Sequence, residues 1–508
     1  MHARSLGAFA AVLTLVFTGQ LFAQAPVARG PIPALPAGDD YSDPSLKEHQ
    51  AKLLAWYGGD YRNIPLEAKA RYFQWLWSRY HFTVDDQISL GVTLPAERGQ
   101  PVKERYGRDN STWNGTALSA LSYQYAVTRD PETLAMIVRL VKGLHLYQQV
   151  SGAAGLAARC VMRSDLPVQD CKQRYVAPDG TVYHYQTEPA KGTYNQLVGG
   201  YAALFMFAAA DLPADIRKLA HDDMIALVYH VVQHEYKLTE ADGTPTRYGD
   251  LTPRIATLGV PFNAQVAYMI VSTGAYFPPE DDARREAILR ELRSLRDTHH
   301  VYYEDPLRHL IRPQQIGGSR FVKGMNDRFH VTSAAFIGLN LELNAARLSG
   351  RPFDRTFVHQ LGQTMYWSMD EIHDKKNSYC AFMWGAILSD PQVFDAIIPK
   401  KADAARGQLA ASLEQGVEQL RRFPLDRFFP SGNAIQVKEP VWVDEFRPDE
   451  YKWKHDPLEG WKTTGPSTNV LVCPIDYLQA YWLMRLYKLE EHPAVVEKHQ
   501  AVLVREAK

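Results

Sequence analysis

The chain has 508 residues, of which 46% are hydrophobic and 22% are charged, and these proportions exclude disordered and fibrous proteins. Lysine and arginine number 56 against 57 aspartates and glutamates, which gives a formal net charge of -1 at pH 7. A balanced charge does not indicate a nucleic-acid-binding surface or a polybasic membrane patch, so we expect neither nucleic acid nor anionic lipid as a partner.

Residues 1–23 have the features of a secretory signal peptide. Arg4 precedes an apolar run over residues 6–17, and small residues suited to cleavage follow at Ala23 and Ala25. An uncleaved anchor helix is the alternative. No later apolar stretch approaches the ~20 residues that a bilayer span requires, so we expect a periplasmic or secreted protein without stable membrane insertion.

The four cysteines indicate disulfide chemistry if the chain is exported. Cys160 and Cys171 bracket a short loop, and we expect them to be bonded, with Cα atoms less than about 7 Å apart. A second bridge between Cys380 and Cys473 is left open. The sequence has no Cys-x-x-Cys and no His-Glu-x-x-His, so we expect no metal and no cofactor.

A repeated pair of helices dominates the sequence after a Pro/Gly-rich leader at residues 24–44. Each pair begins with a helix that is apolar nearly all round, turns, commonly at a proline, and returns as a more charged helix. The apolar helices are predicted at residues 113–126, 194–207, 262–276, 331–343, 378–387 and 475–486. Strand patterns are few, and the clearest covers residues 180–185.

The pairs predict an all-α fold. A helix that is apolar all round must be enclosed, whereas its charged follower can face water on one side. Six pairs around one axis give an (α/α)6 toroid of six helical hairpins, which we expect for residues 45–508 as a single domain. An open solenoid or two helical bundles are the alternatives.

In a toroid, all inner helices begin at one mouth. The residues at these starts are mostly polar: Asp109, Asn110, Asn114, Tyr194, Asn195, Asn263, Asn326, Asp327, His330, Asn377 and Asp476. Long loops leave from the same side, at residues 151–192, 237–260, 299–329 and 423–473. These features predict a concave, polar-lined site at the mouth. Each Asn or Asp taken alone is also explained as a helix N-cap.

The last of these loops contains Trp442, Trp453 and Trp461 among charged residues. Flat aromatic faces stack on pyranose rings, and Arg or Lys binds uronate carboxylates, so we expect carbohydrate contacts here. A loop that is packed by its own aromatic side chains is the alternative.

The pattern resembles the six-hairpin carbohydrate-active proteins, which include unsaturated glucuronyl hydrolases and uronate polysaccharide lyases. Residues 107–116, followed by residues 126–132, are similar to the inner-helix entry of the glucuronyl hydrolases, and this resemblance implies a catalytic role for Asp109. Residues 179–185, followed by Tyr194, look like the Asp-Gly…His…Tyr stretch of the toroidal lyases.

The two chemistries need different residues. Glycoside hydrolysis uses two carboxyl groups, about 5–5.5 Å apart for retention or roughly 6.5–9.5 Å for inversion. Asp109 is the first candidate, and the second is left open among Glu188, Asp250 and Asp327.

β-Elimination needs a group that neutralises the uronate, a base and an acid. Asn110 and Arg159 are candidates for the first role, His184 or His330 for the base, and Tyr194 for the acid.

We therefore expect an exported enzyme that acts on an acidic, uronate-bearing glycan, by hydrolysis in the first instance. A uronate lyase and a non-catalytic glycan-binding toroid are the alternatives. The catalytic candidates are Asp109, His184, Tyr194 and His330. The candidates for substrate binding are Asn110, Arg159, Asn195, Asn263, Asn326, Trp453 and Trp461.

Overall fold

The structure is a computed structural model. It describes residues 40–100, 103–105, 109–164, 171–253, 262–298, 324–398, 400, 402–431, 434–437, 440–445, 460–463 and 466–503. For residues 103–105, 324–328, 434–437 and 460–463 only the backbone is described. The predicted signal peptide, nearly all of the leader, Trp453 and the side chains of Asn326, Asp327 and Trp461 lie outside the described part.

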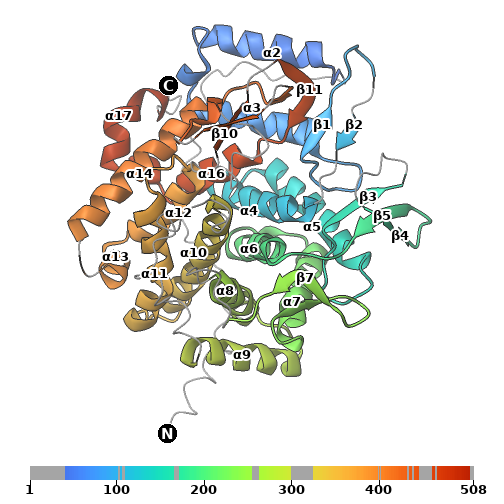
Figure 1. Cartoon of the computed structure of the whole chain (residues 1–508), viewed down its shortest axis with the longest axis vertical. Coiled ribbons are helices and arrows are strands. Elements are labelled where there is room, and N and C mark those ends of the chain that lie inside the picture. The colour runs from blue at the N-terminus through green and yellow to red at the C-terminus, as the bar shows by residue number, and fades with distance from the viewer. Residues whose placement is uncertain are drawn as a thin grey trace.

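Helices dominate the described chain, as the sequence predicts (Figure 1). All six segments predicted as apolar helices are helical. They are α4 (Asn110–Thr128), α6 (Lys191–Phe207), α8 (Phe262–Tyr276), α10 (Gly324–Leu348), α12 (Ser378–Leu388) and α16 (Ile475–Leu486). Most of their described side chains are buried: α8, for example, buries every residue from Phe262 to Gly274.

These six helices pack against one another in chain order. α4 contacts α6, α6 contacts α8, α8 contacts α10, α10 contacts α12, and α12 contacts α16. α16 then returns to α4, where Gln479 Nε2 donates to Ser119 Oγ at 2.5 Å. The first and last of the six are therefore neighbours in space.

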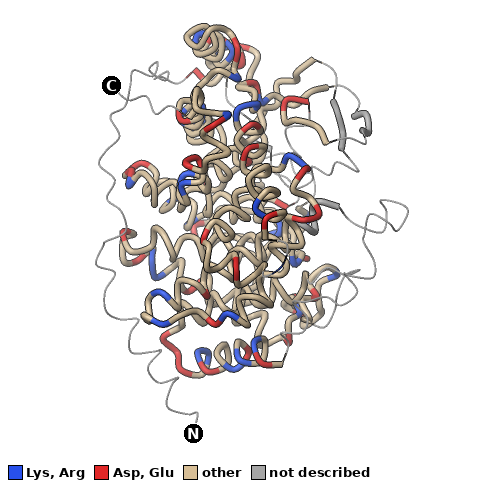
Figure 2. The backbone as a smooth tube through the Cα atoms, turned by 90° about the vertical axis from the view of Figure 1, so that its left-hand side faces the viewer, with Lys and Arg blue, Asp and Glu red and all other residues tan. Residues whose placement is uncertain are grey.

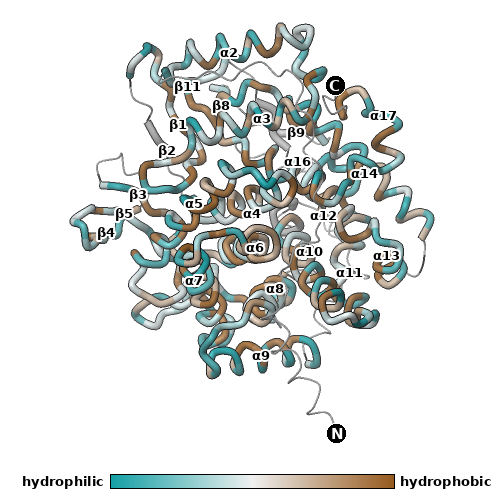
Figure 3. The backbone as a smooth tube through the Cα atoms, turned by 180° about the vertical axis from the view of Figure 1, so that it is seen from behind, coloured by the Kyte–Doolittle hydropathy of each residue, from teal (hydrophilic) through white to brown (hydrophobic). Residues whose placement is uncertain are grey.

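More charged helices lie outside this group. They are α5 (Pro131–Gln149), α7 (Ala214–Gln233), α9 (Asp282–Asp297), α11 (Arg355–Ile372), α13 (Pro391–Ile397), α14 (Ala402–Arg422) and α17 (Pro493–Leu503), and α2 (Asp43–Trp56) and α3 (Leu66–Leu76) precede the first pair. α9 buries only Ile288 and Leu295, and Figure 2 shows charges of both signs along it at the edge of the molecule. Figure 3 shows hydrophilic and hydrophobic residues alternating along α9.

Proline begins several outer helices, as expected from its missing amide hydrogen. Pro131 and Pro391 stand in the first turns of α5 and α13, where Asp130 and Asp390 accept hydrogen bonds from the following backbone amides. Local sequence thus fixes where these helices begin.

α4 and α6 approach each other closely because glycines face the contact. A Cβ atom on Gly200 would lie 2.3 Å from the carbonyl oxygen of Gly115, and one on Gly115 would lie 2.5 Å from that of Gln196. Both distances are far below van der Waals contact, so only hydrogen fits at these two positions.

Short antiparallel strands occur in the segments that precede the inner helices, where the sequence predicts few. β3 (Cys160–Arg163), β5 (Val182–Gln186) and β4 (Gln173–Val176) form a sheet in that order, β6 (Lys237–Thr239) pairs with β7 (Pro245–Asp250), and β9 (Ala434–Val437) pairs with β10 (Gly460–Thr463). A fourth sheet has the order β2 (Lys103–Arg105), β1 (Gly91–Thr93), β11 (Ser467–Val472) and β8 (Phe428–Pro430). The predicted strand at residues 180–185 corresponds to β5.

The cysteines divide into one bonded pair and two buried thiols. Cys160 and Cys171 form a disulfide with Cα atoms 6.5 Å apart, which confirms the predicted bond. Cys380 and Cys473 are buried and not bonded to each other, so no second bridge forms. Among the described helices, none is long and apolar enough to cross a bilayer.

Candidate functional site

Asp109 and Arg159 form an ion pair at the N-terminal end of α4. Asp109 precedes the first residue of α4, yet its carboxylate makes no capping hydrogen bond to the helix. Its Oδ1 atom instead accepts hydrogen bonds from Arg159 Nε, at 2.8 Å, and from Arg159 Nη2. The Asp109 side chain is 47% exposed and that of Arg159 13% exposed. Both hydrogen bonds use Oδ1, so Arg159 does not engage Oδ2.

The backbone of Arg159 is held from two sides. Its amide donates to the carbonyl oxygen of Gln186 at 2.7 Å. Its carbonyl oxygen accepts hydrogen bonds from the amide and from the hydroxyl of Ser111, at 3.1 and 3.0 Å. Because β5 and α4 both fix this residue, the guanidinium reaches Asp109 from a position that is already ordered.

Tyr194 holds the loop before Arg159. Its hydroxyl donates to the carbonyl oxygen of Gly155 and accepts a hydrogen bond from the amide of Ala157 at 3.3 Å. The side chain is fully buried, and burial raises the pKa of the phenol far above its ordinary value. The hydroxyl of Tyr194, which is predicted as a catalytic acid, thus contacts the segment that leads to Arg159.

Asn110, predicted to bind substrate, is also fully buried. Its Nδ2 atom donates to the Tyr147 hydroxyl at 2.8 Å. Asn114, one turn later, accepts from the amide of Ile88 at 2.7 Å and donates to its carbonyl oxygen at 3.1 Å. The two asparagines thus attach residues 87–88 to α4, which is a structural role.

A second cluster lies where α6 and α8 begin and in the second turn of α10, and these three helices contact one another. α10 begins at Gly324, so His330 does not stand at a helix start, contrary to the prediction. Lys191 Nζ donates to Asn263 Oδ1 at 2.8 Å and lies 4.9 Å from the Phe262 ring centroid. The Phe262 ring lies 6.0 Å from that of His330, and Asn195 donates hydrogen bonds to His330. The structure thus brings together Asn195, Asn263 and His330, and their role in substrate binding or catalysis stays a prediction.

Lys191 is not among the predicted site residues, although it lies in the same first turn of α6 as Tyr194. The two clusters adjoin through the first turns of α4 and α6, where Thr112 Oγ1 donates to Thr193 Oγ1 at 3.1 Å. Arg159 and Lys191 therefore lie at the starts of α4 and α6, and His330 packs beside the start of α6. The positive side chains of Arg159 and Lys191 add there to the positive ends of the helix dipoles, which favours an anionic ligand.

His184, Asp250 and Glu188, which are also predicted site residues, lie outside the hydrogen bonds that the structure describes in these two clusters or contact them through the backbone. His184 is a half-buried residue of β5, paired with Met162 and Arg174, two residues before the Gln186 that holds Arg159. Asp250 accepts a hydrogen bond from Asn263 Nδ2 at its backbone oxygen, at 3.0 Å. Glu188 is exposed.

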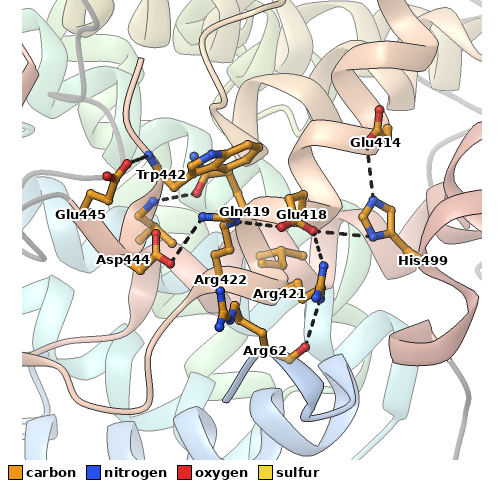
Figure 4. Close-up of polar contacts among 12 residues, drawn as sticks. Arg62, Glu414, Glu418, Gln419, Arg421, Arg422, Trp442, Asp444, Glu445 and His499 are labelled. Atoms are coloured by element: carbon orange, nitrogen blue, oxygen red, sulfur yellow. Dashed lines mark hydrogen bonds and ion pairs between the residues drawn. The ribbon is translucent and has the colours of Figure 1, made fainter. Parts of the chain in front are cut away.

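Trp442 belongs to a different, structural cluster. Lys376 Nζ lies 4.3 Å and Arg422 Cζ 4.6 Å from its ring. Figure 4 shows the ion pairs around it, in which Glu418 accepts from Arg422 at 2.8 Å and Asp444 lies 3.6 Å from Arg422. These cations belong to α14 and to the segment before α12, so Trp442 packs against other parts of the chain and, among the described residues, not against aromatic side chains of its own loop.

Asp476, at the start of α16, is bound by a buried arginine. Arg427 Nη2 lies 2.9 and 2.8 Å from its two carboxylate oxygens, and the side chains are 1% and 4% exposed. This pair ties the segment before β8 to the last inner helix. A buried pair of this kind is costly to break, because the remaining charge would lose its partner.

Among the described residues, no three His, Cys, Asp or Glu side chains lie together in a way that would hold a metal ion. Comparisons of the chain with family models, with curated proteins and with solved structures find no match.

Proposed function

We propose that this protein is a six-hairpin (α/α)6 toroid that hydrolyses an acidic, uronate-bearing glycan at the end where its inner helices begin. The contacts from α4 through α6, α8, α10 and α12 to α16, and from α16 back to α4, support a closed ring. In such a ring the helix starts meet at one mouth, and Asp109, Lys191 and Asn263 lie at the starts of α4, α6 and α8.

The Asp109–Arg159 pair is the observation that carries the proposal. Asp109 is a half-exposed carboxylate that the helix does not use as a cap, and Arg159 holds one of its oxygens. Glycoside hydrolysis requires such a carboxylate beside the scissile bond, and Oδ2 is the oxygen that would act. Lys191, in the adjoining cluster, supplies a positive charge of the kind that binds a uronate carboxylate.

β-Elimination is the second candidate, and the cluster around Lys191 favours it. There a cation, the amide of Asn263 and the imidazole of His330 lie together. Elimination uses a group that neutralises the uronate carboxylate and a second group that takes up a proton. A glycan-binding protein without turnover is the remaining alternative.

Product analysis on a panel of uronate polysaccharides, with a neutral glycan as control, tests the proposal. Hydrolysis releases reducing ends without a new chromophore. Elimination also releases reducing ends, but each comes with absorbance from a new C4–C5 double bond, and this result would replace hydrolysis by the second candidate. If the intact chain gives neither reducing ends nor the new absorbance, both enzymatic proposals are contradicted.

A further inference from the structure

We infer that Asn195 fixes His330 as a neutral imidazole with its proton on Nε2, so that His330 is a hydrogen-bond donor in the site and not its base. The tautomer follows from contacts within the chain alone. The identity of the ligand that binds the Nε2–H group of His330 rests on the proposed function.

The orientation of the Asn195 amide is set by a backbone carbonyl. Asn195 Nδ2 lies 2.9 Å from the carbonyl oxygen of His330 and 3.1 Å from its Nδ1 atom. A carbonyl oxygen can only accept, so the group that faces it must be the NH2 of the amide. The reverse orientation would place two oxygen atoms against each other.

The same NH2 group reaches the imidazole, and this sets the tautomer. Because the amide nitrogen has no acceptor capacity, Nδ1 of His330 must accept the hydrogen bond with its lone pair. A neutral imidazole then carries its proton on Nε2. The imidazolium form would direct an Nδ1 hydrogen at the hydrogens of the amide, so the contact with Asn195 opposes it.

The cost of this arrangement is visible at the other end of the amide. Asn195 is fully buried, and its Oδ1 atom has no hydrogen-bond partner among the described residues. A buried acceptor without a partner destabilises a fold. In this orientation the amide NH2 group of Asn195 forms both hydrogen bonds to His330, and its oxygen forms none with the described residues.

The Nε2 edge of His330 faces Gly192 in the first turn of α6. A Cβ atom on Gly192 would lie 3.0 Å from Nε2 and 3.2 Å from Cε1, so a side chain there would crowd this edge. The adjacent residue is Lys191, and Phe262 packs edge-on against the imidazole from α8. His330 itself is 7% exposed.

This set of groups fits a carboxylate. Nε2–H of His330 is a donor. Lys191 is a cation on the same turn of α6 as Gly192, and the start of α6 adds the positive end of its dipole. We therefore assign the carboxylate of a uronate residue to His330 and Lys191. A histidine in this tautomer cannot remove the C5 proton through Nε2, which separates it from the base that elimination needs.

Long-range proton–nitrogen NMR on the full chain labelled with 15N-histidine tests the tautomer. The His330 signals are assigned by their loss in His330→Gln. We expect the neutral ring to carry its proton on Nε2 in the wild type. In Asn195→Asp, a carboxylate replaces the NH2 donor, and Nδ1 should then carry a proton. Wild-type His330 with its proton on Nδ1 would overturn the inference, and this result does not depend on whether Asn195→Asp folds.

Titration with glucuronate, with glucose as the neutral control, tests the assignment of the carboxylate. We expect glucuronate, and not glucose, to shift the His330 signals of the wild type. Gly192→Ala, which keeps both Asn195 and His330, should weaken this binding at least about tenfold. Gly407→Ala, where a Cβ atom meets nothing within 4 Å, is the matched control.

Equal effects of the two sugars, or unchanged binding in Gly192→Ala, would contradict the assignment. A selective shift without turnover of any polysaccharide would contradict the proposed hydrolysis and leave the carboxylate site standing. The two failures are thus distinguishable.

Discussion

Asp109 stands where an aspartate ordinarily caps a helix, and its pairing with Arg159 changes what a substitution there would do. Asparagine caps a helix as well as aspartate does, so a capping Asp109 would tolerate the change. In the structure the carboxylate makes no capping bond and accepts two hydrogen bonds from a guanidinium. Asparagine keeps the shape of this side chain and removes its charge.

We predict that Asp109→Asn lowers kcat at least about a hundredfold, because hydrolysis requires the carboxylate. The midpoint of thermal unfolding should change little, since a partly exposed ion pair contributes about 0–1 kcal/mol. Asp211→Asn is the matched control: Asp211 is also 47% exposed and pairs with Arg129 at 2.9 Å, at the other end of α4. Retained activity in Asp109→Asn, measured beside this control, would remove Asp109 from the reaction.

Lys69 gives a prediction about pH. It is a buried residue of α3 whose Nζ atom donates to the backbone oxygens of Arg421 and Phe423, at 2.7 and 3.0 Å, at the C-terminal end of α14. Burial lowers the pKa of Lys69 to about 7. Between pH 7 and 10 the unfolded chain therefore holds more protons than the folded one, and stability rises with pH.

In Lys69→Met this contribution is absent, so the free energy of unfolding should rise less steeply over the same range. The difference in slope should reach up to about 1.4 kcal/mol per pH unit. Urea unfolding of both proteins at pH 7, 8 and 9 measures it. Parallel curves would show that Lys69 does not titrate in this window.

At the scale of single side chains, the sequence placed Asp109 at a helix start and Arg159 in a loop, and the structure agrees with both placements. It did not predict that Tyr194 and Asn110 are fully buried. The reason lies in the inner helices themselves. A helix that is buried on every side has no apolar stripe, so its periodicity does not show which side faces the axis of the group. Tyr194 and Asn110 are polar residues of such fully buried helices, and the side chains of both form hydrogen bonds with neighbouring segments of the chain.

At the scale of elements, the inner helices were predictable and the added strands were not. The apolar runs and the prolines locate α4, α5 and α12 within a few residues. Gln173–Val176, in contrast, has no clear alternation of apolar and polar residues, and it becomes β4 by pairing with β5. Strand formation of this kind depends on the partner more than on local propensity.

The contact between α4 and α6 gives a prediction about packing. Gly200→Ala should destabilise the protein by about 1–3 kcal/mol, because the added methyl group meets the backbone oxygen of Gly115, which cannot move aside as a side chain would. Gly407→Ala, on the exposed face of α14, should instead stabilise the protein by up to about 1 kcal/mol, as alanine does in an open helix. Chemical unfolding of both variants measures the difference, and equal effects would contradict the close approach of the two helices.

At the scale of the whole molecule, several buried histidines make the fold sensitive to acid. Burial lowers the pKa of His81 and of His230 to about 4, and it also lowers those of His49, His492 and His499. His230 Nδ1 bonds to the Ala154 carbonyl, and its Nε2 accepts from the Thr239 amide, so a second proton has no place there.

We predict that stability falls as the pH drops from about 6.5 towards 4, because the unfolded chain binds protons that the folded chain excludes. His81→Asn places an amide near the position of Nδ1, within reach of the Ser89 carbonyl that Nδ1 contacts at 2.9 Å, and removes the titration. Its unfolding free energy should decline less steeply with acid than that of the wild type. Thermal unfolding at half-unit steps of pH measures this, and identical slopes would exclude a contribution from His81.

The return of α16 to α4 has a consequence for the order in which the chain can fold. α16 lies between α12 and α4, and Tyr477 of α16 donates to the carbonyl oxygen of Leu66 at 2.8 Å. A chain that is synthesised from its N-terminus makes this helix after all the other inner helices. Until then, the apolar surfaces of α4 and α12 that α16 covers have no native cover. The nascent protein therefore carries exposed apolar surface until nearly its whole length is made, which is the condition under which chaperones bind and truncated chains aggregate.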